Sequence, residues 1–245
     1  MTIKVGLCGW TIAALRYVER FSVLEVQQTF YQPPDDKVLQ RWRALVPAEF
    51  EFTVKAWMLI THRATSPTYR RLRRELTDEE HAGAGSFQDT PIVHEAWKRT
   101  LACTRLLRGT SILFQCPASF KPTDENLASM RRFFARIDRE RTRPADMRLM
   151  FEPRGKTWTK AIVAPLCAEL GLVHVVDPLV HRTVTTGVRY YRLHGTTGAR
   201  HVYTDTELAK IASLVPKRGE TYVMFNNMPR VGDSARFMRL VGLSD

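Results

Sequence analysis

The chain has 245 residues, of which 44% are hydrophobic, and its 37 Lys plus Arg against 25 Asp plus Glu give a formal charge of +12. This length and apolar content can form a sizeable core, as one large α/β domain or two small ones. They exclude a disordered chain, a collagenous repeat and a disulfide-rich miniprotein. The sequence contains neither a signal peptide's long apolar region nor an uncharged apolar run of about 18 residues. We therefore expect a soluble, cytoplasmic protein with no membrane partner.

Short β-rich apolar runs recur along the chain, at residues 3–10, 22–30, 50–60, 110–117, 147–154, 172–178, 188–195 and 221–227. Segments with helical spacing lie between most of them, at residues 35–46, 91–107, 124–138, 159–171 and 205–215. Thr123 or Asp124 is expected to cap the helix that begins near 124, and Asp205 the last one. Gly171 is expected to end the helix before it in a left-handed conformation.

Alternating strands and helices predict parallel strand pairing, and eight strands in this length are typical of a (β/α)8 TIM-like barrel. The alternative is a doubly wound open sheet, but the first strand lacks the third glycine of its phosphate-binding turn. The connections 11–21 and 178–187 are too short for full helices. The connection 61–91 after the third strand is long and basic, which suggests a lid or a binding loop. Without an internal repeat, we expect one domain over residues 1–245.

Barrel enzymes hold their chemistry at the carboxyl ends of the strands, where this sequence places many polar side chains. The candidate catalytic residues are Glu25, Glu152, Asp177 and His194. The candidate substrate-binding residues are Trp10, Thr29, Tyr31, Lys55, His62, Arg154, Trp158, Arg192, Asn226 and Asn227.

Each residue type suggests a role. The carboxylates suit a general base or a metal ligand, the histidines a proton shuttle or a metal ligand, the cations an anion site, and the large aromatic rings a stacking surface. Structural ion pairs and a simple turn at Asn226 and Asn227 are the alternatives.

The sequence limits how many metal ions the protein could hold. The strand ends provide five candidate ligands, which are enough for one divalent ion but too few for three ions. They are Glu25, His62, Glu152, Asp177 and His194. There is no HExxH or HxH pair, and the four cysteines form no CxxC pair. One divalent metal therefore remains open, and we expect no nucleotide cofactor.

Arginines form two clusters, residues 70–74 and residues 131–143. Arginine suits bidentate phosphate contacts, so DNA or RNA is a candidate partner. A solvated helix face, or the ion-paired surface of a heat-adapted protein, explains the charge equally well. The oligomeric state is left open.

Motifs in a fixed order resemble the domain of unknown function 72 family (YecE-like proteins): GLCGW, EVQQTFYQPP, FEFTVKAWMLITH, SILFQCPASF, FEPRGKTW, VVDP, YYRLHG and YVMFNN. The resemblance spans about residues 3–240 and implies a TIM-like barrel, but no established biochemical activity. The family usually has a serine at the position of Cys8, an asparagine at that of Gln27 and a serine at that of Gln28. The architecture is also similar to endonuclease IV and xylose-isomerase-like proteins, which transfers no chemistry.

Three functional hypotheses follow. The first is an enzyme, such as a hydrolase, that acts on a phosphodiester or other phosphorylated substrate, above all nucleic acid. The second is a small-molecule enzyme for a sugar, sugar phosphate or carboxylate. The third is a non-catalytic nucleic-acid-binding protein.

Overall fold

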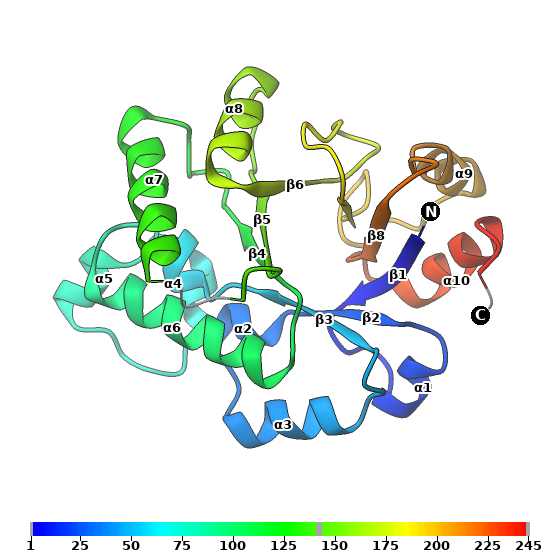
Figure 1. Ribbon diagram of the computed structural model, residues 1–245, viewed down its shortest axis with the longest axis horizontal. Coiled ribbons are helices and arrows are strands. Elements are labelled where there is room, and N and C mark those ends of the chain that lie inside the picture. Colours follow the sequence, from blue (N-terminus) through cyan, green and yellow to red (C-terminus); the bar gives the residue numbers. More distant parts are fainter. Residues whose placement is uncertain (1, 141–143, 244–245) are drawn as a thin grey trace.

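The computed structural model describes residues 2–140 and 144–243, and its strands form a closed barrel (Figure 1). Neighbouring strands pair in parallel in the order β1 to β8, and β8 pairs with β1. The predicted (β/α)8 barrel is therefore confirmed, and the open sheet is excluded. The strands are β1 (Thr2–Cys8), β2 (Val23–Val26), β3 (Glu51–Lys55), β4 (Ser111–Gln115), β5 (Arg148–Glu152), β6 (Leu172–Val176), β7 (Arg189–Leu193) and β8 (Glu220–Phe225).

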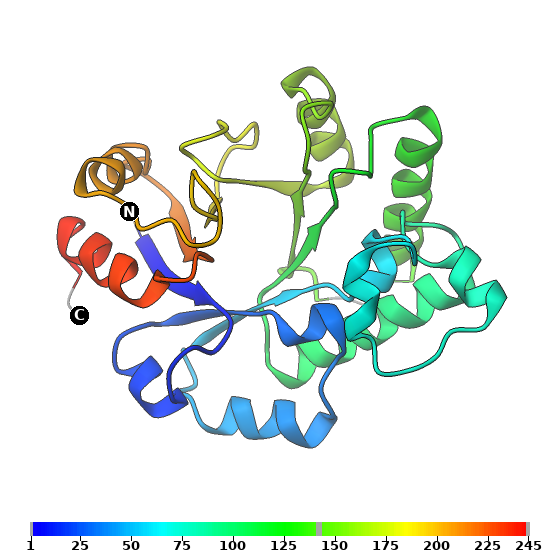
Figure 2. The ribbon, with the colours of Figure 1, turned by 180° about the vertical axis from the view of Figure 1, so that it is seen from behind.

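Helices surround the barrel in both views (Figures 1 and 2). The five segments with helical spacing form helices whose ends lie within two residues of expectation. These are α3 (Asp36–Ala44), α6 (Pro91–Leu106), α7 (Asp124–Arg139), α8 (Lys160–Leu170) and α9 (Asp205–Ser213). The sequence did not indicate α1 (Ala14–Val18), α2 (Gln28–Tyr31), α4 (Met58–Thr61), the 3-10 helix η1 (Pro67–Arg71), α5 (Asp78–Gly83) or α10 (Arg230–Leu240).

The second and third strands are shorter than predicted, because each runs directly into a helical turn, α2 and α4. The apolar residues of α4 are buried on every side, and such a run has no periodicity that separates strand from helix. Thr29, Tyr31 and His62 therefore lie on or after helical turns rather than on strands. The Thr29 hydroxyl donates to the Lys55 carbonyl oxygen at 2.6 Å, which ties α2 to β3.

Helix ends follow the expected chemistry with one correction. The Thr123 side chain accepts a hydrogen bond from the Asn126 amide at the start of α7. Thr204, rather than Asp205, caps α9, because it forms a reciprocal pair of hydrogen bonds with Glu207. Gly171 ends α8 with φ of 63°, as predicted.

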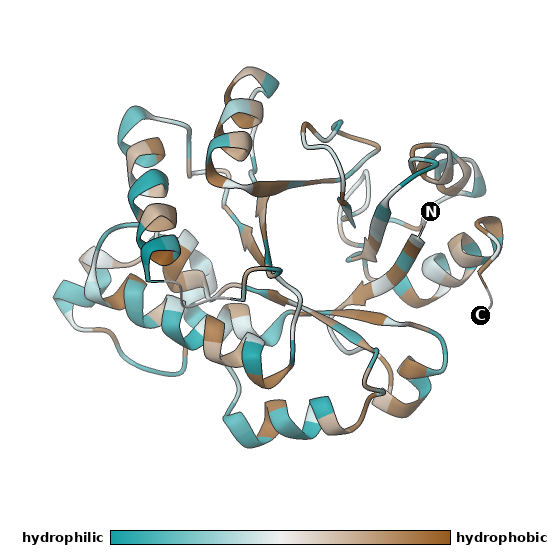
Figure 3. Ribbon diagram, in the orientation of Figure 1, coloured by the Kyte–Doolittle hydropathy of each residue, from teal (hydrophilic) through white to brown (hydrophobic). Residues whose placement is uncertain are grey.

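Apolar side chains form an inner and an outer layer, and strands such as β6 are coloured hydrophobic in Figure 3. The outer layer packs the strands against the helices, as where Phe114 of β4 contacts Phe133 and Phe134 of α7. The inner layer fills the barrel and consists of Cys8, Val23, Leu113, Met150, Val175, Tyr190, Tyr222 and Met224. All four cysteines are free and buried, as expected.

The connection between β6 and β7, residues 177–188, contains no helix and forms the yellow loop between α8 and α9 in Figure 1. The buried His174 of β6 holds it, because its Nδ1 accepts a hydrogen bond from the Val184 amide. Burial lowers the pKa of His174 to about 4, so the ring is a neutral acceptor. This loop is therefore fixed to β6.

The described residues contain no helix long and apolar enough to cross a membrane. The long third connection contains α4, η1 and α5. Arg141 and Arg143 of the second arginine cluster lie outside the described residues.

Candidate functional site at the carboxyl end of the barrel

Arg192 of β7 is the centre of a buried ion network at the carboxyl end of the strands. Its Nη2 lies 2.8 Å from Glu25 Oε1 of β2, and its Nη1 lies 2.6 Å from Glu152 Oε2 of β5. The Arg192 side chain is 0% exposed. The sequence suggested that Arg192 holds an anion of the substrate. The structure does not support this role, because the N–H groups of Arg192 donate to the internal carboxylates Glu25 and Glu152. We call Glu25, Glu152, Arg154, Arg192 and His194 the mouth cluster.

Glu25 is also fully enclosed, which changes the role expected for it. It accepts hydrogen bonds from Arg192, Tyr190 at 2.8 Å and Gln27. A carboxylate with its oxygens occupied in this way is poorly suited to activating water. The geometry makes Glu25 a positioning residue that fixes Arg192.

His194 lies just after β7, where a carboxylate and a guanidinium compete for the same ring nitrogen. Its Nε2 lies 2.8 Å from Glu152 Oε1 and 2.6 Å from Arg154 Nη2. Asn226 Nδ2 is a donor 3.0 Å from Nδ1, so the neutral ring carries its hydrogen on Nε2 and donates it to Glu152. Nδ1 is then the nitrogen that can take and return a proton, and Glu152 stabilises the protonated ring.

Charges around His194 set its protonation state. Burial favours a neutral Glu152, but the Arg192 and Arg154 guanidinium groups outweigh it and hold the pKa of Glu152 well below its usual range. Burial lowers the pKa of His194, although the Glu152 carboxylate opposes the shift. The pair at neutral pH is therefore an ionised glutamate beside a neutral imidazole.

Asp177 and Asn226 position His194. One Asp177 oxygen accepts from the His194 amide at 3.2 Å, and the other accepts from the Leu179 amide at 3.1 Å. Asn226 Nδ2 lies 3.0 Å from His194 Nδ1. Asp177 thus orders the chain around the histidine, and burial raises its pKa.

A pocket of about 470 Å³ opens beside the mouth cluster between β5, β6 and β7. Arg154 lines it and is half-exposed, and its Nε has no hydrogen-bond partner among the described residues. Lys160 and Arg182, both exposed, add positive charge. The N-terminus of α8 borders the pocket, where the side chain of its cap, Thr159, makes no capping bond. This helix N-terminus and the three cations together favour an anionic ligand.

Sequence reasoning missed Lys160, His181 and Arg182 as pocket residues. The signal for His181 and Arg182 was the sixth connection, which is too short for a helix and so brings its loop to the barrel mouth. His181 and Arg182 lie in that loop, and Lys160 begins α8.

Lys55 ends β3 and is only 5% exposed. Its Nζ lies 3.6 Å from the centroid of the Phe30 ring, and no hydrogen bond or ion pair joins it to any described residue. Burial, with a contribution from Arg192, lowers the pKa of Lys55 to about 7. Burial and Lys55 lower the pKa of the neighbouring His62 to about 3, and its Nδ1 lies 2.8 Å from Thr61 Oγ1.

The aromatic candidates separate in space. Trp158 lines the pocket, and its Nε1 donates to the Phe120 carbonyl oxygen at 2.8 Å. Trp10 instead packs edge-on against Tyr17 and other rings of the outer layer, so it is not a stacking wall of this pocket. Tyr31 lines a separate hollow of about 420 Å³.

Asn227 is also structural. It is fully buried, and its Nδ2 donates to Asp233 Oδ2 at 2.5 Å and to the His201 carbonyl oxygen at 2.9 Å. The expected contact of Asn227 with substrate is therefore replaced by a contact between the end of β8 and α10.

Metal ligands do not converge at the mouth. Within residues 2–140 and 144–243, no three His, Cys, Asp or Glu side chains are grouped so that they could hold a metal ion. The reason is visible in the mouth cluster, where Glu25 and Glu152 both face Arg192.

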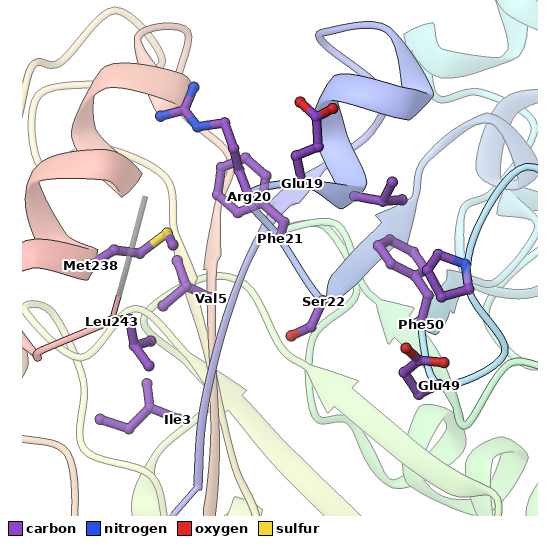
Figure 4. Close-up of a pocket in the computed structure, with 12 residues that line it drawn as sticks. Ile3, Val5, Glu19, Arg20, Phe21, Ser22, Glu49, Phe50, Met238 and Leu243 are labelled. Carbon is purple, nitrogen blue, oxygen red and sulfur yellow. The ribbon is translucent and has the colours of Figure 1, made fainter.

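Another hollow, of about 300 Å³, lies at the opposite end of the barrel (Figure 4). Ile3 and Val5 of β1 face Met238 of α10 across it, with Phe21 and Phe50 nearby. Its lining is largely apolar and contains none of the candidate residues.

Solved structures share this architecture. A DUF72 family protein from Enterococcus faecalis V583 has 18% identity and a TM-score of 0.73, covering 99% of this chain and 98% of its own. One from Thermotoga maritima MSB8 has 17% identity and a TM-score of 0.68, covering 99% and 100%. A xylose isomerase domain protein from Alicyclobacillus acidocaldarius has 11% identity and a TM-score of 0.52, covering 98% and 99%. At these identities the likeness shows the fold alone.

A search of curated proteins finds no match. The model of the family described as "Protein of unknown function DUF72" matches residues 14–243. That match covers most of the chain, in agreement with the motifs and the barrel, and the chain belongs to the DUF72 family.

Proposed function

We propose that the protein is an enzyme that binds a phosphorylated substrate in the pocket beside the mouth cluster and uses His194 to move a proton. The observation that carries this proposal is the position of His194 between Glu152 and Arg154 on the wall of a cationic pocket. Arg154 is 35% exposed on the pocket wall, and the exposed Lys160 and Arg182 are free to approach an anion. Glu152 orients the imidazole.

The finer form of the proposal is hydrolysis of a phosphodiester. Arg154 and Lys160 hold the non-bridging oxygens, and Nδ1 of neutral His194 takes the proton of the water that attacks phosphorus. The Nε2 hydrogen remains bonded to Glu152, which stabilises the protonated ring, and Nδ1 can return its proton to the leaving oxygen. His194 replaces Glu25 as the base because Glu25 is enclosed by Arg192, Tyr190 and Gln27.

Nucleic acid is the candidate macromolecular substrate. The Arg71 guanidinium lies 3.6 Å from the centroid of the Tyr31 ring, and both residues line the 420 Å³ hollow together with Arg73. This hollow follows β2, so it opens at the carboxyl end of the barrel, as the pocket does. Cations beside an aromatic face suit a phosphate backbone and a base.

Calorimetric titration with inorganic phosphate, and turnover of bis(4-nitrophenyl) phosphate, test the proposal. We expect Arg154→Gln to weaken phosphate binding about tenfold, which is about 1.4 kcal/mol, and the exposed Lys156→Gln to leave it unchanged as the matched control. His194→Asn should keep binding and lower turnover by about 10² to 10⁴. Equal phosphate affinity in Arg154→Gln and the wild type would refute the anion site.

Titration with a labelled oligonucleotide tests the nucleic-acid form. Its affinity should fall with salt, with a log-log slope near −0.9 per phosphate contacted. We expect Arg71→Gln and Arg73→Gln to reduce that slope. If oligonucleotide binding does not change with salt, nucleic acid is ruled out as the substrate. The proposal would then hold only for a small phosphorylated substrate.

A further inference from the structure

Lys55 differs from the two arginines of the mouth cluster. Arg192 is paired with Glu25 and Glu152, and Arg154 is paired with Glu152. Lys55 is nearly as buried as Arg192 and far more buried than Arg154, yet no acceptor among the described residues lies within bonding distance of its Nζ. Burying an unpaired ammonium is costly, so the environment favours the uncharged amine.

Charged groups face this amine from several elements. Arg192 of β7 and Arg154 after β5 disfavour the ammonium, and Glu25 of β2 and Glu152 of β5 favour it. His62, at the end of α4, is neutral. The balance leaves a large share of Lys55 as free amine near neutral pH, whereas an ordinary lysine is almost wholly protonated there.

A free amine at the mouth can act as a nucleophile, and the other groups leave that role open. His194 already provides proton transfer, and Arg154 already provides a cation for an anion. We propose that Lys55 forms an imine with the carbonyl carbon of an anionic aldehyde or ketone bound at the barrel mouth. This inference rests on the proposed function for the anionic group and adds the carbonyl to it.

The covalent step balances without an oxidant or a metal. The Nζ lone pair forms a C–N bond to the carbonyl carbon, and the carbonyl oxygen takes the proton that Nζ releases. A second proton, from solvent, lets that oxygen leave as water while the nitrogen lone pair completes the C=N bond. The product is a cationic iminium and one water.

Phe30 explains why the iminium would be stable at this position. Its ring face lies 3.6 Å from Nζ, and it attracts a cation there. The iminium has the same single positive charge as the ammonium, so Phe30 stabilises the product of the step. Lys55 is only 5% exposed, which also restricts the water that would hydrolyse the iminium.

Reductive trapping tests the inference on the wild-type protein. We would incubate it at pH 7 with glyceraldehyde 3-phosphate and cyanoborohydride, which reduces an iminium to a stable secondary amine, and map the modified peptides by mass. Lys55 should be modified at least about tenfold faster than the exposed Lys37, because far more of it is unprotonated. The rate at Lys55 should reach half its maximum near pH 7.

Variants separate the nucleophile from the cation. Lys55→Arg keeps a cation but no amine, so the rapid modification should vanish while phosphate binding stays within about twofold and thermal unfolding confirms the fold. Lys37→Met is the matched control and should keep the rapid modification at Lys55. Modification of Lys55 no faster than that of Lys37 would overturn the inference even where phosphate still binds.

Unphosphorylated glyceraldehyde distinguishes this inference from the proposed function. If the anion site exists, the phosphorylated aldehyde should modify Lys55 at least about tenfold faster than glyceraldehyde at equal low concentration. Equal rates with both aldehydes, each faster at Lys55 than at Lys37, would retain the nucleophile and overturn the anionic-substrate part. Phosphate binding without modification of Lys55 would retain the anion site and overturn the role of Lys55 as a nucleophile.

Discussion

The two ends of the barrel both hold ion networks, but only the network at the carboxyl end lies beside a pocket lined by exposed cations. At the amino end, Lys4 Nζ lies 2.5 Å from Glu51 and 2.6 Å from Glu220, and Arg148 Nη2 lies 2.8 Å from Glu220. The Tyr222 hydroxyl donates to Glu51 at 2.6 Å. We call Lys4, Glu51, Arg148, Glu220 and Tyr222 the base cluster.

In the base cluster every charged group is paired, whereas the mouth has unused groups. Lys4 and Arg148 face Glu51 and Glu220 in a closed, balanced set. Arg154 Nε and Lys55 Nζ at the mouth have no hydrogen-bond partner among the described residues. A buried ion pair is therefore weak evidence for a functional site, and groups left without a partner are the better guide.

Removing Arg192 should produce the largest loss of stability. Arg192→Met leaves Glu25 and Glu152 buried without their shared cation, so we expect the free energy of unfolding in urea to fall by about 3 to 5 kcal/mol. The double variant Arg192→Met, Glu25→Gln should recover part of that loss. A loss below about 1 kcal/mol would mean that Arg192 does not hold the mouth together.

As pH falls, stabilising contributions at the carboxyl end of the barrel should be lost before those of the base cluster. The neutral ring of His174 has a folded pKa of about 4, below the ordinary 6.5, so between these pH values the unfolded state binds more protons. Stability should therefore fall as pH drops through this window, by about 3 kcal/mol for this group. Glu220 of the base cluster, whose pKa is lowered despite burial, should contribute only in more acidic solution.

Urea unfolding at several pH values checks this order. His174→Gln should flatten the dependence between pH 6.5 and pH 4. Glu220→Gln should leave that range unchanged and alter the profile below it. A profile that His174→Gln leaves as steep as before would contradict the neutral buried ring.

Breaking the base cluster should affect stability without affecting ligand binding. Glu51→Gln removes one carboxylate from Lys4 and Tyr222, and we expect a loss of about 1 to 3 kcal/mol in the free energy of unfolding. Phosphate affinity, measured by calorimetry, should stay within about twofold. A larger drop in affinity would show that the two ends are coupled.

The smallest effect should come from Asn226, which contacts His194 without closing an ion pair. Asn226→Ala removes a donor that favours the neutral ring, so the pKa of His194 should rise towards its ordinary value. Proton NMR of the ring signals measures the pKa, and unfolding should change by less than about 1 kcal/mol. An unchanged titration would remove Asn226 from the site.

Strand ends were predictable because hydrophobic runs and polar termini are local patterns. The strands were located from those runs, and Glu152, Arg154 and His194 meet where the barrel rule expected them. Which arginine faces the ligand was not predictable. Arg154 and Arg192 have the same chemistry at strand ends, yet one is 35% exposed and the other 0%.

The sequence by itself determined the alternation of strands and helices, the excess of positive charge and the collection of polar side chains at one end of a barrel, because periodicity and parallel pairing are properties of the chain. Only the tertiary structure decided which charges neutralise one another. Closing the barrel brings β2, β5 and β7 around Arg192 and leaves Lys55 of β3 with no hydrogen-bond or ion-pair partner among the described residues. Pairing depends on distances of a few ångströms between strands remote in sequence, and local pattern contains no measure of these distances.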